Sequence, residues 1–277
     1  MSYHRPSELA AALKLLAQAG GQIVAGGTDV YPSAQQGIHP DYYLDVTAIS
    51  ELSEISLGPD GTRIGASVTW SELVQADLPP AFDCLKEAAR EVGSLQIQNA
   101  GTIAGNICNA SPAADGVPPL LVLDAQVELC SAQRGKRVIA LSHFIQHVRR
   151  TDRADDELVT AIIIPPVSNN VFSAFNKLGS RRYLVISITM CAAVVGCDAD
   201  GKIEFVKVAV GACSPVAQRL FDLEQKIIGK TIDEVTVSQK HLAGLSPIDD
   251  VRGSESYRLD VVAEQCTRAI RRAMSHE

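Results

Sequence analysis

The sequence predicts an α+β protein with two regions, about residues 1–167 and 168–277. Helical and extended segments alternate in the first region, whereas the second reads as consecutive extended segments that end in a long helical one. The adjacent residues Pro165 and Pro166 separate the two patterns, and proline interrupts both helices and strand ladders. A chain of 277 residues is long enough for two domains and a proper core.

The first region opens with a small unit over about residues 1–55. The stretch "PSELAAALKLLAQAGG" at 6–21 predicts a helix, because its leucines recur at helical spacing and a glycine pair ends it. "QIVA" at 22–25 predicts a short strand, and "YYLDVT" at 42–47 predicts another. Together these segments indicate a β–loop–α/β unit.

The remainder of the first region also alternates between strand and helix. Residues 62–76 predict a strand and then a helix that starts with a capping box, in which Thr69 is followed by Glu72 three residues later. Residues 82–93 predict a further helix with an apolar face. Strands are expected over "LLVLDAQVELCSA" at 120–132 and "KRVIALSHF" at 136–144, and "DELVTAIIIP" at 156–165 closes the region.

The second region has a different rhythm. Residues 172–182 and 186–215 predict consecutive antiparallel strands, two of them joined at the turn "DADG", 198–201. Helical segments close the chain, and the last of them spans roughly 256–274. The region therefore reads as a smaller domain of antiparallel strands plus helices.

Charge and cysteine content exclude several classes of protein. The chain has 25 basic and 32 acidic residues and a net charge of −7, which argues against nucleic acid or an anionic membrane as the main partner. Its seven cysteines are odd in number and form no C-x-x-C pair, so neither a disulfide framework nor a metal site is predicted. The sequence opens without a signal-peptide apolar core, and no apolar run reaches the roughly 20 residues of a membrane span. We expect a cytoplasmic protein.

Two stretches combine glycines with small polar residues: "VAGGTDV" at 24–30 and "GTIAGNICNASPAAD" at 101–115. Glycine lets another molecule approach the main chain closely, and successive exposed N–H groups form a concavity that attracts an anion, most often phosphate. Two such loops are suited to the phosphates and sugar of a dinucleotide, and Asp115 to ribose or ribityl hydroxyls. The alternative is that both stretches are ordinary turns and loops.

Other sites for these stretches are poorly supported. No G-x-G-x-x-G opens a helix after the first strand, and no G-x-x-x-x-G-K-[ST] occurs, which argues against Rossmann and P-loop sites. No G-x-S-x-G appears, so a hydrolase is weakly supported. His143 and His147 have the spacing of one helix face, but no third metal ligand is evident and a surface pair is favoured.

Four motifs occur in a specific order: "IVAGGTDV", "GTIAGNICNASPAAD", "ELVTAIIIP" and "FNKLGSRR". In this order and spacing the chain resembles the FAD-binding subunit, or domain, of the molybdenum hydroxylases, the family of xanthine dehydrogenase and carbon monoxide dehydrogenase. The resemblance extends to "DVRGSESYR" at 250–258. It implies a two-subdomain FAD-binding module of the PCMH/VAO-like type, with subdomains of about 1–55 and 56–167, followed by a C-terminal domain over 168–277.

The resemblance also implies a cofactor site. Residues 24–30 would wrap the FAD pyrophosphate through backbone N–H groups, and the second stretch would form the other half of the cradle. Asp115 would bind the sugar region, and Lys177 would lie near the flavin, where a cation favours the anionic reduced form. The implied FAD-binding residues are Val24, Ala25, Gly26, Gly27, Thr28, Asp29, Val30, Thr102, Gly105, Asn106, Asn109, Asp115, Val159 and Lys177. No catalytic acid or base and no metal ligand are implied.

The sequence departs from the family pattern at two points. The family's second loop more often reads T-I-G-G-N, and Ala104 replaces the first of those glycines. The preceding "QIQNAGT" lacks arginines that relatives often carry there, which bears on surface contacts more than on FAD. A four-iron cluster insertion of one branch of the family is absent from the sequence.

The implied function is electron transfer within a heteromeric complex. A molybdopterin-binding large subunit would hydroxylate the substrate, and a small subunit with [2Fe-2S] clusters would pass electrons to FAD on this chain. FAD would then deliver them to NAD+ or another acceptor. Two alternatives remain: a stand-alone flavin oxidoreductase with its own substrate pocket, and a flavin-free scaffold of the same fold.

Overall fold

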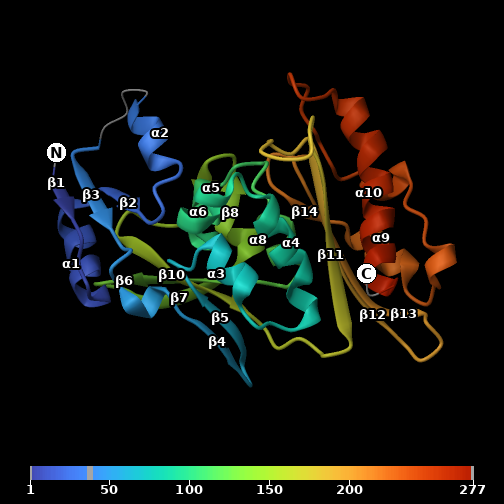
Figure 1. Cartoon of the computed structure of the whole chain (residues 1–277), viewed down its shortest axis with the longest axis horizontal. Coiled ribbons are helices and arrows are strands. Elements are labelled where there is room, and N and C mark those ends of the chain that lie inside the picture. The colour runs from blue at the N-terminus through green and yellow to red at the C-terminus, as the bar shows by residue number, and fades with distance from the viewer. Residues whose placement is uncertain (1, 36–39, 276–277) are drawn as a thin grey trace.

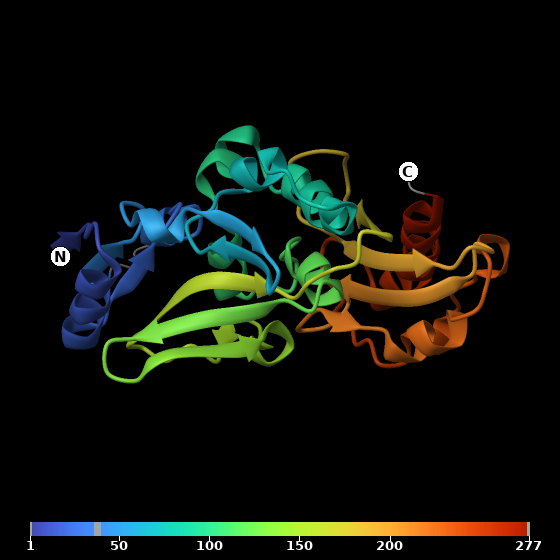
Figure 2. The ribbon, with the colours of Figure 1, turned by 90° about the horizontal axis from the view of Figure 1, so that it is seen from below.

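A computed structural model gives the structure of the chain and describes residues 2–35 and 40–275. Three sheets follow one another along the long axis in chain order, from the N-terminal sheet through a central one to the C-terminal one (Figures 1 and 2). Two helices of the central part pack against the third sheet. No helix in the described part of the chain is both long and apolar enough to cross a membrane.

The first sheet is parallel, with the strand order β1-β3-β2. Its strands are β1 (Ser2–His4), β2 (Gln22–Val24) and β3 (Tyr42–Asp45), and its helices are α1 (Leu9–Ala19) and α2 (Val30–Gln35). The predicted helix and both predicted strands are confirmed. Strand β1 was not predicted, because it is short and all three of its residues are exposed, so it has no apolar pattern.

The second sheet has the order β4-β5-β10-β6-β7 and is antiparallel throughout. Its strands are β4 (Ile55–Gly58), β5 (Gly61–Gly65), β6 (Gln126–Ser131), β7 (Gly135–Ala140) and β10 (Glu157–Ile164). Strand β10 is central and buried along almost its whole length, which explains its nearly continuous apolar sequence. The register of β10 against β6 shifts between Val159 and Ala161, a bulge of the kind that re-aims side chains near binding sites.

Short helices connect and cover these strands. They are α3 (Trp70–Gln75), α4 (Asp83–Glu91), α5 (Leu95–Ala100), α6 (Ile103–Asn109), α7 (Val117–Val122) and α8 (Leu141–Phe144), with a small sheet of β8 (Ile145–His147) and β9 (Arg150–Thr151). The predicted capping box is confirmed, because the backbone N–H of Thr69 donates to Glu72 Oε2 at 2.7 Å and that of Glu72 to Thr69 Oγ1 at 3.2 Å.

Two predicted strands are partly wrong. Residues 120–122 belong to helix α7, and the strand starts only at Gln126. Helix α7 carries prolines in its first turn, where proline favours a helix start, and all its residues are buried, which erases helical periodicity. The second strand ends at Ala140, and residues 141–144 form helix α8, so His143 and His147 lie in different elements.

The C-terminal sheet has the order β11-β12-β13-β14 and is antiparallel. Its strands are β11 (Val171–Leu178), β12 (Thr189–Cys197), β13 (Ile203–Gly211) and β14 (Gln218–Arg219), and its helices are α9 (Phe221–Ile227) and α10 (Glu255–Ser275). The turn at 198–201 joins β12 to β13 as predicted. Helices α9 and α10 cover one face of this sheet (Figure 1), whereas α4 and α7 pack on the other.

Strand β12 takes part in two cores. Met190, Ala192 and Val194 pack into the same core as the central sheet and its helices. The alternate residues Cys191 and Ala193 pack instead against α10. Successive side chains of a strand point to opposite faces, so this strand is buried on both sides.

Glu157, at the start of β10, is expected to contribute to stability in its ionised form. Its side chain is 2 % exposed and accepts hydrogen bonds from Arg137 Nε at 2.6 Å and Arg137 Nη2 at 2.7 Å. These hydrogen bonds hold the pKa of Glu157 below its usual value, against the effect of burial. Its contribution is therefore present above the unfolded-state pKa of about 4.3 and is lost as the pH falls through the folded value.

We expect Glu157→Gln to lower the free energy of unfolding by about 1–3 kcal/mol at pH 7 and by less at pH 3. Urea unfolding at both pH values measures this difference. Glu264→Gln is the control, because Glu264 pairs with Arg268 on an exposed helix face and should change stability by less than about 0.5 kcal/mol. An equal loss for Glu157→Gln at the two pH values would contradict the ionic origin.

Candidate cofactor site

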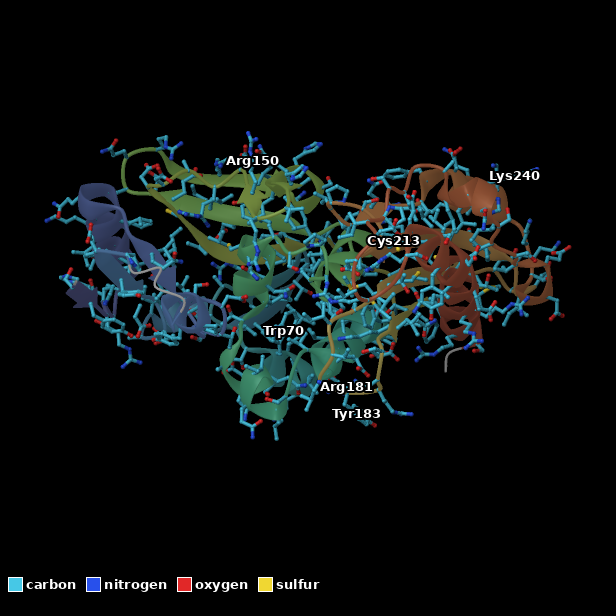
Figure 3. The ribbon with its side chains drawn as sticks, turned by 90° about the horizontal axis from the view of Figure 1, so that it is seen from above. Trp70, Arg150, Arg181, Tyr183, Cys213 and Lys240 are labelled. Atoms are coloured by element: carbon cyan, nitrogen blue, oxygen red, sulfur yellow. The ribbon has the colours of Figure 1, made fainter. Side chains whose placement is uncertain are left out.

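A cleft of about 480 Å³ lies at the junction of the first sheet, helices α5 and α6 and strand β10. Its lining residues come from four parts of the chain: 21–23, 25–30 and Val46; Ala66, Trp70, Val92 and Ile97; 101, 102, 104–106, 108 and 109; and Arg153, Leu158 and Val159. Both glycine-rich stretches of the sequence reach this cleft. Trp70, which lines it, lies near the middle of the molecule (Figure 3).

The first stretch forms the turn between β2 and α2. Gly27 has a φ of +70°, which favours glycine, and the ring of Tyr31 lies against it, so that a methyl group there would be 2.2 Å from the ring. The N–H groups of residues 26–29 donate to no acceptor among residues 2–35 and 40–275. Four consecutive free N–H groups at a cleft make an anion-binding surface.

Part of the second stretch, residues 103–109, forms helix α6, whereas the sequence analysis expected a loop throughout. Thr102 is the N-cap of α6, and its Oγ1 accepts a hydrogen bond from the N–H of Gly105 at 3.0 Å. Ile103 and Ile107 are fully buried on the inner face of this helix. The stretch thus contributes to the core while its other face lines the cleft. Ala104 is nearly buried and lies within the lining.

The two stretches are in direct contact. A methyl group at Gly26 would lie 1.8 Å from the carbonyl oxygen of Ala100, so only glycine allows this approach. Asn109 Nδ2 donates to Asp29 Oδ1 at 2.9 Å and joins the other ends of the stretches. The two sides of the cleft are therefore held at a fixed separation.

One polar atom beside the cleft has no partner. Asn106 Oδ1 is buried and makes no hydrogen bond among the described residues. Buried polar atoms are normally paired, so this oxygen is suited to accept from a ligand hydroxyl. The free N–H groups fit a phosphate, the Asn106 oxygen fits a sugar hydroxyl, and the absence of bulky side chains at 25–28 leaves room for both. The donor set fits a dinucleotide such as FAD.

Most of the predicted site residues meet at this cleft. Eleven of the fourteen line it: Ala25, Gly26, Gly27, Thr28, Asp29, Val30, Thr102, Gly105, Asn106, Asn109 and Val159. The structure does not place the side chains of the other three, Val24, Asp115 and Lys177, in its lining. Val24, the last residue of strand β2, is 1 % exposed and is therefore buried in the protein.

Asp115 and Lys177 pair with each other. Lys177 Nζ lies 2.7 Å from Asp115 Oδ2 and also donates to the carbonyl of Glu91 at 3.0 Å. The hydroxyl of Ser187 donates to Asp115 Oδ1. Burial raises the pKa of Asp115, and the charge of Lys177 acts in the opposite direction. The carboxylate predicted to hold a sugar is thus already bonded, and it ties the segment after α6 to strand β11.

Sequence reasoning missed several lining residues. Trp70, Val92 and Ile97 are apolar and carry no signal that separates a cleft wall from a core. Arg153 was also missed, although it lies only four residues before Glu157, the first residue of the "ELVTAIIIP" motif. A single arginine in an acidic loop has no motif to distinguish it.

Two family comparisons match the chain. Residues 1–167 match the family described as "FAD binding domain in molybdopterin dehydrogenase". Residues 174–273 match the family described as "CO dehydrogenase flavoprotein C-terminal domain". The two matches follow each other along the chain and together span most of it.

Whole-length relatives give the same result. The chain is 31 % identical over 269 residues to the glyceraldehyde dehydrogenase medium chain of Sulfolobus acidocaldarius, covering 94 % of each protein. It is 25 % identical over 278 residues to the carbon monoxide dehydrogenase medium chain of Hydrogenophaga pseudoflava, covering 98 % of this chain and 96 % of the relative. A chain of the reconstituted CO dehydrogenase from Oligotropha carboxidovorans superposes with a TM-score of 0.91 at 25 % identity, covering 100 % of this chain and 98 % of that one.

Proposed function

This chain belongs to the family of FAD-binding medium subunits of molybdenum hydroxylases, and from this premise we propose that it binds FAD in the cleft between the two glycine-rich stretches and transfers electrons within an oxidoreductase complex. The observation that carries the proposal is the row of free N–H groups at residues 26–29. Residues 26–29 line the cleft together with residues of α6.

We propose the following roles for the lining residues. The N–H groups of 26–29 bind the pyrophosphate, and the hydroxyl of Thr28 adds a donor. Gly26 and Gly105 keep the main chain accessible, and Asn106 accepts from a hydroxyl of the cofactor. Val159, re-aimed by the bulge in β10, supplies an apolar wall. Of the three predicted residues outside the lining, Val24 is part of the core, and Asp115 and Lys177 form a buried ion pair that stabilises the structure beside the site.

The division into domains is part of the same proposal. Residues 1–167 form the FAD-binding module, with subdomains of about 1–55 and 56–167, and residues 168–277 form the C-terminal domain. The cleft lies where the two subdomains meet, since β2 and α2 come from the first and α6 and β10 from the second. A cofactor bound there would be held by both subdomains.

The partners follow from the family. We propose that a large subunit with molybdopterin and a small subunit with [2Fe-2S] clusters assemble with this chain. When bound, FAD would supply the chemistry that accepts electrons from the clusters and delivers them to NAD+ or another acceptor. This chain's residues would hold and orient the cofactor and exclude water around it.

The single tryptophan of the chain provides the test. Trp70 is 2 % exposed and lines the cleft, so bound FAD should quench its fluorescence strongly. We expect titration of the full chain with FAD to give saturable quenching and a retained visible flavin band after the excess is removed. Trp70→Phe is the control, because it should keep the flavin band while losing the fluorescence signal.

Copurification separates the remaining alternatives. The chain isolated from its native source should carry flavin and two further polypeptides, one with molybdenum and one with iron. A flavin-bearing chain that purifies alone and oxidises a substrate would favour a stand-alone oxidoreductase. A native complex without flavin would favour a scaffold and would overturn the proposal.

A further inference from the structure

Arg153 is the only basic residue among the described residues that line the cleft. The other charged residue of the lining is Asp29, which is bonded to Asn109. FAD carries its negative charge on its two phosphates, and backbone N–H groups supply only partial positive charges. A full positive charge at this wall is therefore the natural complement to that ligand.

The guanidinium of Arg153 is anchored at one nitrogen only. Its Nη1 donates to the carbonyl oxygens of Ala154 at 3.0 Å and Glu157 at 2.9 Å. Its Nε and Nη2 donate to no acceptor in residues 2–35 and 40–275, and none of its nitrogens pairs there with a carboxylate. Two free donors on one edge of a planar group match two oxygens of a phosphate.

The lack of a carboxylate partner is notable because the loop around Arg153 is acidic. Asp152 and Glu157 bind Arg137, and Asp156 binds Arg134. Three of the neighbouring carboxylates are thus used by arginines outside the cleft. The fourth, Asp155, forms no ion pair with Arg153 within residues 2–35 and 40–275.

Arg153 lines the cleft together with Cys108 of α6. Burial raises the pKa of Cys108 to about 11, and the charge of Arg153 acts against that rise, as it does only at close range. Val159, the implied apolar wall of the site, is six residues farther along the same segment.

We propose that Arg153 is a cofactor-binding residue whose free Nε and Nη2 bind a phosphate of FAD. The inference rests on the proposed function, since it requires FAD in this cleft. It adds a side-chain contact to the backbone cradle, from a residue that none of the four motifs contains. The contact makes part of the affinity ionic, and salt screens ionic contacts.

The test compares Arg153→Leu, Arg153→Lys and the control Arg150→Leu in the full chain. Arg150 is exposed and lies at the outer edge of the molecule (Figure 3). FAD is titrated against Trp70 fluorescence at low and high salt, and riboflavin, which has no phosphate, is titrated in parallel. Melting temperatures establish that each variant is folded.

We expect Arg153→Leu to weaken FAD binding about 10- to 100-fold, as for a lost hydrogen bond to a charged group. The salt dependence of the FAD dissociation constant should decrease, Arg153→Lys should recover part of the affinity, and Arg150→Leu should resemble the wild type. Riboflavin binding should be the same in all four proteins.

Two results would overturn this inference and leave the proposed function in place. One is wild-type FAD affinity and salt dependence in Arg153→Leu. The other is an equal loss of FAD and riboflavin binding, which would indicate a packing role. Absence of FAD binding to the wild-type chain would overturn the proposed function and this inference together.

Discussion

Gly26→Ala is expected to abolish tight FAD binding. The added methyl group would lie 1.8 Å from the carbonyl oxygen of Ala100 and 2.9 Å from Cα of Gly101. Both contacts are with backbone, which cannot rotate away as a side chain can. The two glycine-rich stretches must therefore separate, and the proposed pyrophosphate site would lose its geometry. We expect FAD affinity about 100-fold weaker and a loss of about 1–3 kcal/mol in the free energy of unfolding.

The matched control is Gly58→Ala. A methyl group at Gly58 meets nothing closer than the carbonyl of Gly61 at 4.0 Å, and Gly58 is not among the residues that line the cleft. Fluorescence titration and urea unfolding of both variants separate the local clash from a general cost of replacing glycine. Wild-type FAD affinity in Gly26→Ala would mean that the two stretches do not form the cradle.

Lys177→Met is expected to be the most destabilising single change among those considered. It leaves the carboxylate of Asp115 buried without its counter-ion, and breaking a buried pair in this way costs about 3–5 kcal/mol. The pKa of Asp115, already raised by burial, should rise further. The folded state then holds a proton that the unfolded state, with a pKa of about 3.9, has released. Stability of the variant should therefore fall as the pH rises from 5 to 8.

Adding Asp115→Asn to Lys177→Met tests whether the unpaired charge of Asp115 causes the loss of stability. In the double variant the buried charge is gone, so stability should recover partly and lose its pH dependence. Lys240→Met is the surface control, because Lys240 is exposed near the far end of the C-terminal domain (Figure 3). A pH-independent loss in Lys177→Met would show that the lysine acts through packing alone.

The turn with unpaired N–H groups at residues 26–29 could be predicted from the sequence because its chemistry is local. The free N–H groups belong to consecutive residues, 26–29, directly after a strand. Their proximity requires no contact with a distant part of the chain. Strand β10 was predicted for a similar reason, since a run such as "LVTAIII" is long enough to be recognised as buried. The capping box at Thr69 is also complete within four residues.

Features that depend on distant parts of the chain were not predictable in the same way. Asp115 was assigned to a ligand, but its partner Lys177 is 62 residues away and its bond is set by the packing of β11. The second half of helix α7, residues 120–122, was predicted as part of a strand because burial on all sides removes the periodicity that distinguishes a helix from a strand. The proposed role of Arg153 depends on the ion pairs that neighbouring carboxylates form with Arg134 and Arg137.

Strand β12, which is buried on both faces, affects the order in which the protein folds during synthesis. Met190, Ala192 and Val194 complete a core that begins with residues of the central sheet, so more than two thirds of the chain must leave the ribosome before that core can close. Until then the nascent flavin-binding part exposes an apolar face, a state that is prone to aggregation. The C-terminal sheet must therefore fold onto the central part before this core is complete. We expect FAD to bind only after that step.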